Sequence, residues 1–346
     1  MAPAGATSPE ARMLKFGVML RPGHFPFSHM LTCMRVAEEV GFEFMWFGDS
    51  HLIWQEVSPY LAAAASGSRR LTVGPLVSNP VTRHPTVMAS MIATIAQLYE
   101  GRAVLGVGRG DSAVRTLGLP PMPVKQFRET LRTIRALCRG DEVDYGGTAI
   151  HFPWLTHKVP VWVAAYGPRV LELAGAEGDG AILQLASPSV VEWSVGHVRR
   201  GREQAGLPWA GFEVLAGAPT YVSDDRAHAL SRVRGFPATV SNHVRDLLRH
   251  HAPSELPAEL VEGMEQVAGY DYQQHGQPDA PHVRAVTDAM AERLTLIGTA
   301  AEVRDKIKKL EAAGVTQVCL YLSIVEPERH FSTLETYGRE IIPAFR

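Results

Sequence analysis

The sequence has no marked excess of charge of either sign, few cysteines and no long apolar run. Lys and Arg number 34 against 36 Asp and Glu, so nothing indicates a surface for nucleic acid. The three cysteines, Cys33, Cys138 and Cys319, are far apart and have no metal-ligand spacing, which predicts buried thiols in a reducing compartment. No segment approaches the roughly 20 apolar residues that a membrane span needs.

Residues 1–12, MAPAGATSPEAR, also lack the hydrophobic core of a signal peptide. We therefore expect a cytoplasmic protein in which residues 1–12 form a disordered tail and residues 13–346 form one domain.

Several catalytic motifs are missing as well. The chain contains no GxxxxGK[ST] phosphate loop, no GxGxxG fingerprint at its glycine-rich loop and no GxSxG serine motif. A metal-dependent hydrolase barrel would need an HxH pair near its first strand, whereas MLRPGH has a single histidine. We therefore predict neither a serine hydrolase nor a metal-dependent one, and no metal site.

What the sequence does contain is a regular alternation of short apolar runs with helical patterns. The runs are nearly continuous, which is typical of parallel strands buried on both faces. The eight predicted strands are KFGVML (15–20), FMWFGD (44–49), LTVGPLVS (71–78), AVLGVG (103–108), PVWVAA (160–165), GAILQLA (180–186), FEVLAGAPTYV (212–222) and QVCLYLS (317–323).

Eight strand–helix units in a chain of 346 residues favour an α/β fold, a (β/α)8 TIM barrel, over a doubly wound open sheet. Two stretches interrupt the alternation. Residues 143–152 predict a small hairpin, and residues 235–292, rich in His, Pro and Gly, predict a long insertion with some helix. Barrel enzymes usually place such insertions over the active-site face.

Polar clusters follow five of the predicted strands, where a barrel carries its active site. Each cluster also has a plain structural interpretation, such as a turn or a helix cap. The clusters comprise Asp49 and His51; Ser78, Asn79, Arg83 and His84; GVGRGDS from Gly106; AYGP from Ala165 to Pro168; and Gln184 and Ser187. The glycines of GVGRGD would let backbone N–H groups approach an anion, which suits a phosphorylated cofactor.

The run GPLVSNPVTRHPTVMASMIATIAQLYEGRAVLGVGRGDSAVRTLG resembles the bacterial luciferase-like superfamily, most closely the methylenetetrahydromethanopterin reductase branch. The resemblance continues through PVWVAAYGPRVLELAGAEGDGAILQLASP to LIGTAAEVRDKIKKLEAAGVTQ. It covers nearly the whole chain except the tail and residues 235–290. It implies a (β/α)8 barrel with insertions that binds coenzyme F420 or FMN at the C-terminal mouth.

The resemblance also implies a non-prolyl cis peptide near Leu76 and Val77, behind the cofactor ring, and a phosphate held by the GVGRGD loop and the AYGP turn. The predicted cofactor-binding residues are Leu76, Val77, Ser78, Asn79, Gly106, Gly108, Arg109, Gly110, Asp111, Ala164, Ala165, Tyr166, Gly167, Pro168 and Gln184.

The function that this resemblance favours is hydride transfer between F420 and a small organic substrate. His51 is the predicted proton carrier, and Asp49 is predicted either to orient His51 or to hydrogen-bond the cofactor ring. Relatives often read DH where this chain reads DSH, which leaves open which of the two faces the ring. Trp54, Phe25 and GYDYQQHG (269–276) are candidates for an apolar pocket. Alternatives are an FMN-dependent monooxygenase served by a flavin reductase, and a non-catalytic flavin-binding barrel. We expect a homodimer or a larger homo-oligomer.

Overall fold

A computed structural model describes residues 13–346, so the predicted tail lies outside the described residues. Eight parallel strands form the central sheet, in the order β3-β2-β1-β11-β9-β8-β7-β4. Isolated bridges from Val73 to Ala103 and from Ser78 to Val107 join β3 to β4 and close the sheet into a barrel. The strands are β1 (Lys15–Leu20), β2 (Phe44–Phe47), β3 (Thr72–Pro75), β4 (Leu105–Val107), β7 (Val161–Ala164), β8 (Gly180–Leu183), β9 (Glu213–Val222) and β11 (Gln317–Tyr321).

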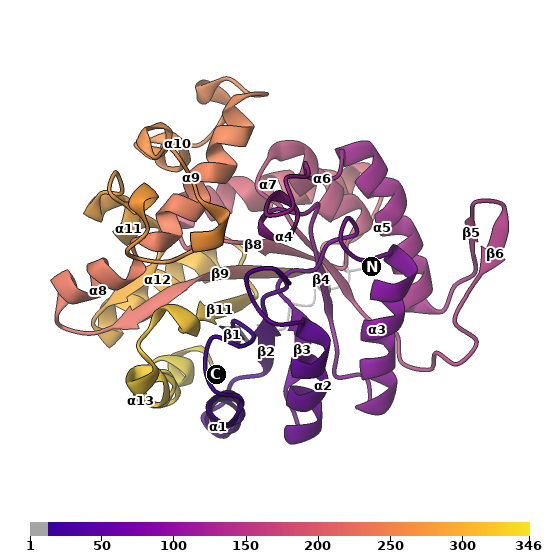
Figure 1. Ribbon diagram of the computed structural model, residues 1–346, viewed down its shortest axis with the longest axis horizontal. Helices are drawn as coiled ribbons and strands as arrows, with labels where there is room; N and C mark the ends of the chain where they lie inside the picture. Colours follow the sequence, from indigo (N-terminus) through magenta and orange to yellow (C-terminus); the bar gives the residue numbers. More distant parts are fainter. Residues whose placement is uncertain (1–12) are drawn as a thin grey trace, which may run out of the picture.

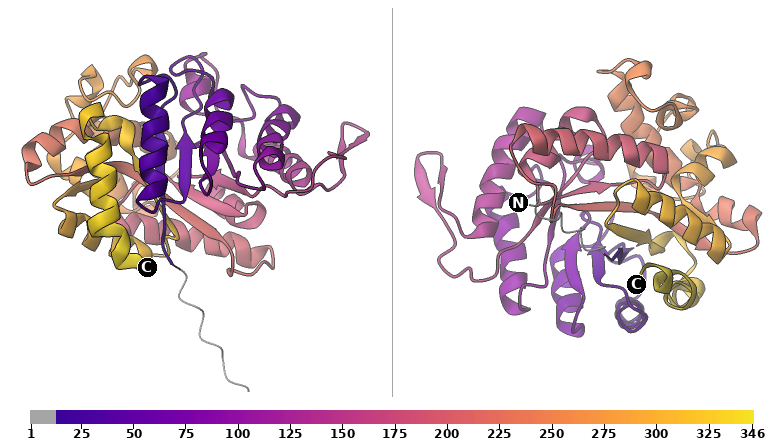
Figure 2. Two further views of the ribbon diagram at one scale, coloured as in Figure 1. Left: turned by 90° about the horizontal axis from the view of Figure 1, so that it is seen from below. Right: turned by 180° about the vertical axis from the view of Figure 1, so that it is seen from behind.

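All eight predicted strands are therefore confirmed, and helices surround the barrel (Figures 1 and 2). The α-helices are α1 (Phe27–Glu39), α2 (Val57–Gly67), α3 (Pro85–Leu98), α4 (Ser112–Arg115), α5 (Val124–Arg139), α6 (Pro168–Glu177), α7 (Pro188–Gln204), α8 (Arg226–Val233), α9 (Gly235–Leu248), α10 (Ala258–Val261), α11 (Asp288–Leu294), α12 (Ala300–Ala312) and α13 (His330–Thr336). Short 3-10 turns are η1 (Pro253–Glu255), η2 (Met264–Gln266), η3 (Tyr272–Gln274), η4 (Pro281–Val283), η5 (Leu322–Ile324), η6 (Pro327–Arg329) and η8 (Ile342–Phe345), and η7 (Tyr337–Ile341) is a π-helix.

Helix α5 shows why these segments are helical. Its buried residues recur every three or four positions and form one apolar face against the barrel, while Gly140 ends the helix with φ of +80°. The buried residues are Phe127, Leu131, Ile134, Leu137 and Cys138.

Aromatic rings from β2 and β7 pack against one another inside the barrel. The Phe44 and Trp46 rings stack with centroids 5.8 Å apart, and the Trp162 ring lies 5.5 Å from Trp46. Glycines on neighbouring strands make room for them: a Cβ at Gly17 would lie 2.9 Å from the Trp46 ring nitrogen, and one at Gly180 would lie 2.8 Å from the Trp162 ring. Aromatic rings therefore fill the space that these glycines leave inside the barrel.

Two segments stand outside the alternation of barrel strands and helices. Strands β5 (Val143–Tyr145) and β6 (Thr148–Ile150) form an antiparallel hairpin that projects from the barrel (Figure 1). Residues 235–292 hold α9, α10, four 3-10 turns and part of α11. An unpredicted strand, β10 (Leu296–Gly298), extends the end of β9 by parallel pairing, and its three residues are too few to give a sequence pattern.

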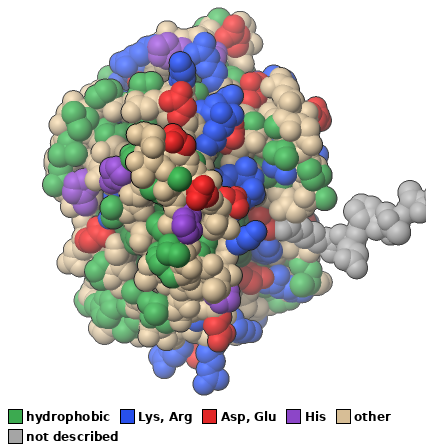
Figure 3. All heavy atoms as spheres, turned by 90° about the vertical axis from the view of Figure 1, so that its right-hand side faces the viewer, with side chains coloured by type: hydrophobic (Ala, Val, Ile, Leu, Met, Phe, Trp, Pro, Cys, Tyr) green, Lys and Arg blue, Asp and Glu red, His purple; other side chains and the backbone are tan. Residues whose placement is uncertain are grey.

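The surface matches the balanced composition. On the face shown in Figure 3, Lys and Arg side chains are interspersed with Asp and Glu side chains. No helix within residues 13–346 combines the length and the apolar character needed to cross a membrane.

Candidate active site

A cavity of about 540 Å³ opens at the C-terminal ends of the strands, within the size range of cofactor sites. Its floor and walls come from the strand ends, and α9 together with the segment around His275 covers it. Part of the segment 235–292 therefore lies beside the strand ends.

The wall beside β3 and β4 contains the expected cis peptide, between Leu76 and Val77. Beyond it the chain continues to pair with β4: Ser78 N–H donates to the Gly106 carbonyl and Gly108 N–H donates to the Ser78 carbonyl, each at 2.9 Å. The two chains are so close that a Cβ at Gly106 would lie 2.3 Å from the Pro75 carbonyl oxygen. Leu76, Val77 and Gly108 line the cavity, whereas Gly106 supports them from outside the lining.

The GVGRGD loop forms the next part of the lining. Gly110 has φ of +97°, a conformation that favours glycine. Asp111 accepts hydrogen bonds from Arg115 Nε at 3.2 Å and from the Tyr272 hydroxyl at 3.3 Å, and His243 Nε2 lies 3.4 Å from its other oxygen. The loop is therefore tied to the insertion through Asp111.

Cationic side chains gather on the side of the cavity that follows β4 and β7. Arg109, Lys125 and Arg169 line it and make no ion pair with any residue in 13–346. Arg109 Nε donates to the Met122 carbonyl at 2.6 Å, and burial lowers the pKa of its guanidinium. Arg115 is instead paired with Asp111 and Asp246. Unpaired cations beside a glycine loop make this side an anion site.

The AYGP turn follows β7. The Tyr166 hydroxyl donates to Gln184 Oε1 at 2.9 Å, and its ring stacks on His243 with centroids 4.2 Å apart. Burial raises the pKa of Tyr166 well above its ordinary value, so the phenol is neutral. Gly167 lets α9 approach, because a Cβ there would lie 2.4 Å from Leu247 Cδ2. Pro168 is the first residue of α6 and lies outside the lining.

The two predicted catalytic residues lie in different surroundings. Asp49 is 4% exposed, lines the cavity and binds Arg83 through both carboxylate oxygens. His51 is exposed in the turn after β2 and lies outside this cavity, in a second, shallower depression with His24 and Leu52. A position just after a strand places a residue at the right end of the barrel but does not fix the direction of its side chain.

The side of the cavity that follows β1 holds a residue that sequence reasoning missed. The Arg21 side chain has no hydrogen bond or ion pair within residues 13–346, and its Nε is buried without a partner. Its guanidinium lies 5.5 Å from the Trp54 ring centroid, and a Cβ at Gly276 would lie 2.4 Å from Arg21 Nη2. Burial lowers its pKa to about 10, so it stays charged at neutral pH. One sequence signal could have identified Arg21 as a site residue: it directly follows a predicted strand, at the barrel end that carries the other candidate residues.

His275 lies on the same side as Arg21. Its Nδ1 is 2.7 Å from the Tyr270 hydroxyl, and burial lowers the pKa of the imidazole to about 4, so the ring is neutral at neutral pH. Of the candidate apolar-pocket residues, Trp54 and His275 line the cavity, whereas Phe25 packs on His330 with ring centroids 4.7 Å apart.

The structure thus brings most of the predicted site residues around one cavity. Gly106, Pro168 and His51 lie outside its lining. Those that line it are Asp49, Leu76, Val77, Ser78, Asn79, Gly108, Arg109, Gly110, Asp111, Ala164, Ala165, Tyr166, Gly167 and Gln184. The residues that sequence reasoning missed include several from the first strand end and from α9, together with two of the three unpaired cations: Arg21, Lys125, Arg169, Phe236, Thr239, His243 and Leu247.

Comparison with known proteins places this barrel in a family. The chain belongs to the luciferase-like monooxygenase family, whose model matches residues 13–317. It is 30% identical over 341 residues to 5,10-methylenetetrahydromethanopterin reductase of Archaeoglobus fulgidus, covering 96% of this chain and 100% of that one. It is 32% identical over 264 residues to an F420-dependent glucose-6-phosphate dehydrogenase of Microbacterium testaceum, covering 70% and 78%.

The solved structure of the coenzyme F420-dependent tetrahydromethanopterin reductase from Methanopyrus kandleri is similar throughout. It superimposes with a TM-score of 0.77 at 26% sequence identity, covering 96% of this chain and all of that chain.

Proposed function

We propose that this protein is an oxidoreductase that binds coenzyme F420 in the cavity and transfers a hydride between it and a small organic substrate. The observation that carries the proposal is the unpaired cationic group Arg109, Lys125 and Arg169 beside the GVGRGD loop. Relatives whose names specify F420 or a tetrahydromethanopterin substrate support it.

The residues present fit a phosphorylated deazaflavin. Gly108 and Gly110 let backbone N–H groups approach a phosphate, and the three cations offset its charge and that of an acidic tail. Val77, Ala164 and Ile182 form an apolar wall for a flat ring. When bound, the deazaflavin supplies a hydride donor or acceptor at its C5.

The opposite side of the cavity is left for the substrate. β1 and β7 lie across the barrel from each other in the strand order, so Arg21, Trp54 and His275 face the cationic group from the far side. We propose that Arg21 binds a polar or anionic group of the substrate. We propose that His275 Nε2, left open by the bond of Nδ1 to Tyr270, moves the substrate proton. Asp49 does not move the proton in this proposal. Its ion pair with Arg83 positions the chain after β2 against the chain after β3.

Binding titrations with F420 and with FMN test this function. Following each cofactor by fluorescence quenching and calorimetry, we expect F420 to bind with one molecule per chain and more tightly than FMN. Replacing Arg109 by Met should weaken binding of F420 more than that of its dephosphorylated form, because the guanidinium would hold the phosphate.

Two results would decide against the proposal. Tight FMN binding together with turnover that requires oxygen would establish the monooxygenase alternative. Absence of binding for both cofactors would exclude a flavin-type oxidoreductase.

A further inference from the structure

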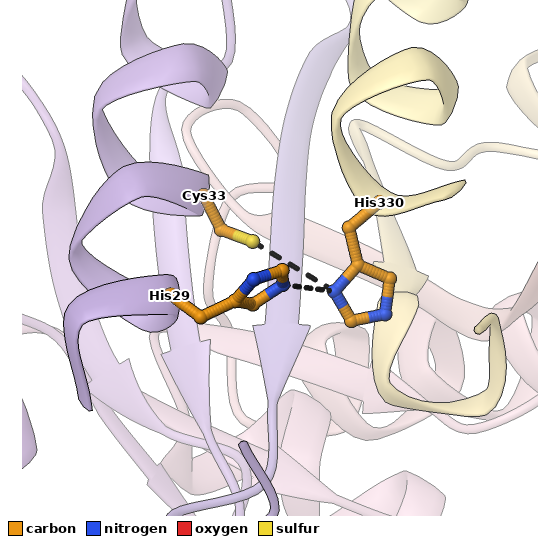
Figure 4. A group of neighbouring side chains, drawn as sticks. All are labelled: His29, Cys33 and His330. Atoms are coloured by element: carbon orange, nitrogen blue, oxygen red, sulfur yellow. Dashed lines mark hydrogen bonds between the residues drawn. The ribbon is translucent and has the colours of Figure 1, made fainter. Parts of the chain in front are cut away.

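Three side chains with metal-ligand chemistry meet between the first and the last α-helix of the barrel (Figure 4). His29 and Cys33 are four residues apart on α1, so they share one face of that helix. His330 is the first residue of α13 and points toward them (Figure 4). None of the three lines the cavity, so the cluster is separate from the proposed active site.

The spacing of the ligand atoms is that of a metal site. His29 Nε2 lies 3.0 Å from His330 Nδ1, and Cys33 Sγ lies 3.8 Å from the same nitrogen. All three atoms lie within 4.8 Å of one another. Around a tetrahedral zinc ion, two nitrogens lie about 3.3 Å apart and a nitrogen and a sulfur about 3.6 Å apart. Small side-chain rotations therefore suffice to place one ion between them.

His330 is already oriented as a ligand. Its Nε2 lies 3.0 Å from the Val325 carbonyl oxygen, which can only accept, so Nε2 carries the proton and Nδ1 presents a lone pair to the cluster. A histidine that ligates a metal commonly donates its other N–H to a carbonyl in this way.

The cluster lies in an apolar shell. Cys33 and His330 are fully buried. The Phe25 ring lies 4.7 Å from the His330 ring, and the Phe331 ring lies 4.9 Å from the His29 ring. Such surroundings lower the local dielectric constant and strengthen the attraction of a thiolate for a cation.

We propose that His29, Cys33 and His330 bind one borderline-soft metal ion, of the class represented by Zn²⁺. Two imidazoles and a thiolate suit zinc and disfavour Mg²⁺ and Ca²⁺, which prefer oxygen ligands. Three protein ligands leave the fourth position to water. The ion links α1 to α13, which pack against each other beside the neighbouring strands β1 and β11. Its role is to hold together the first and last units of the barrel, because an ion that binds only the folded state stabilises it.

Metal titration of the untagged full-length protein, freed of metal by chelation, tests the site. With Zn²⁺ in competition with a chromophoric chelator, we expect one ion per chain and a higher melting temperature. Co²⁺ should give a thiolate-to-cobalt charge-transfer band and the intense visible bands of a four-coordinate ion.

The control variants exploit the other two buried cysteines. Cys33→Ser should abolish the charge-transfer band and weaken Zn²⁺ binding at least tenfold, whereas Cys138→Ser and Cys319→Ser should leave both unchanged. His29→Gln, at a half-buried position on α1, provides the same test if Cys33→Ser fails to fold, and it should keep a weaker thiolate band. Lack of stoichiometric Zn²⁺ binding by the wild type, or a cobalt spectrum without thiolate, would overturn the proposal. F420 binding is measured separately, so failure of one proposal does not affect the other.

Discussion

Asp49 and Arg83 form a two-pronged ion pair at the edge of the cavity, with Arg83 Nε 2.8 Å from Asp49 Oδ2 and Arg83 Nη2 2.9 Å from Asp49 Oδ1. Arg83 also binds Glu56. Both oxygens of Asp49 are thus engaged by one guanidinium. This arrangement fixes the chain after β2 against the chain after β3 and so gives Asp49 a positioning role.

Replacing Asp49 by Asn should therefore act mainly through stability. The pair is partly shielded from water, so we expect the free energy of unfolding to fall by about 1–3 kcal/mol, measured by denaturant unfolding. A variant with full stability but no F420 binding would instead show that Asp49 contacts the cofactor.

The two histidines near the mouth should respond differently to replacement. His51→Ala should leave turnover and cofactor binding unchanged, because its side chain is exposed outside the cavity. His275→Ala should reduce turnover by about 100-fold or more while leaving F420 affinity nearly intact, the usual cost of losing general acid–base help. Steady-state rates of the two variants side by side test this. The reverse result would restore His51 as the proton carrier.

The sequence predicted the barrel well because each of its eight strands is an apolar run bounded by turn residues. The strand β10 was not predicted, because three residues are too few to show an alternation of apolar and polar side chains. The strand is defined only by its pairing with the end of β9. The cavity opens at the strand ends, the face on which the sequence analysis placed its candidate residues, since all parallel strands end on one side.

The sequence alone could not predict which side chains bind each other across long distances in the chain. The ion pair of Arg115 with Asp246 joins residues 131 positions apart, and it places α9 over the GVGRGD loop. Arg83 lies 34 positions from Asp49. His29 and His330 are 301 positions apart, so no motif spacing could indicate their meeting. The missed residues depend on how the insertion and the two ends of the chain fold back.

The Glu56–Arg83 pair predicts a pH dependence of stability. Burial raises the pKa of Glu56, but hydrogen bonds from Arg83 and Ser58 outweigh it and lower the pKa from 4.5 to about 2. A carboxyl whose pKa is lower in the folded state stabilises the protein above the unfolded-state pKa. That contribution is lost as the pH falls from about 4.5 toward 2.

We therefore expect Glu56→Gln to be less stable than the wild type near neutral pH and the difference to shrink over that acid range. Urea unfolding at several pH values measures it. In an Arg83→Met background the Glu56→Gln change should lose most of its pH dependence. A difference that grows on acidification would contradict the assignment.

Substitutions at two glycines of the GVGRGD loop should have different effects, one on the stability of the fold and the other on cofactor binding. A Cβ at Gly106 would lie 2.3 Å from the Pro75 carbonyl oxygen, which belongs to the backbone, so Gly106→Ala should destabilise the fold by about 1–3 kcal/mol. A Cβ at Gly108 would lie 3.2 Å from a methyl group of Val77, on the cavity wall. Gly108→Ala should therefore fold normally but bind F420 about tenfold more weakly, a loss of about 1.4 kcal/mol. Thermal melting and F420 titration of both variants check this contrast; equal effects on melting would contradict it.

Arg21 should show opposite effects on stability and on activity. Its Nε is buried without an ion pair or hydrogen bond within residues 13–346, burial lowers the pKa of the guanidinium to about 10, and Trp54 offers only a ring face at 5.5 Å. Replacing such a charge by an apolar side chain of similar length removes a desolvation cost, so Arg21→Met should raise the free energy of unfolding of the ligand-free protein by about 1 kcal/mol. F420 affinity should change little, because the cationic group that we propose binds the phosphate lies across the barrel. Turnover should fall, mainly through a higher KM for substrate, and Arg21→Lys should recover part of the turnover without the gain in stability.

Denaturant unfolding and initial rates of the wild type, Arg21→Met and Arg21→Lys test this prediction. A less stable Arg21→Met protein would show that the arginine supports the fold rather than the substrate.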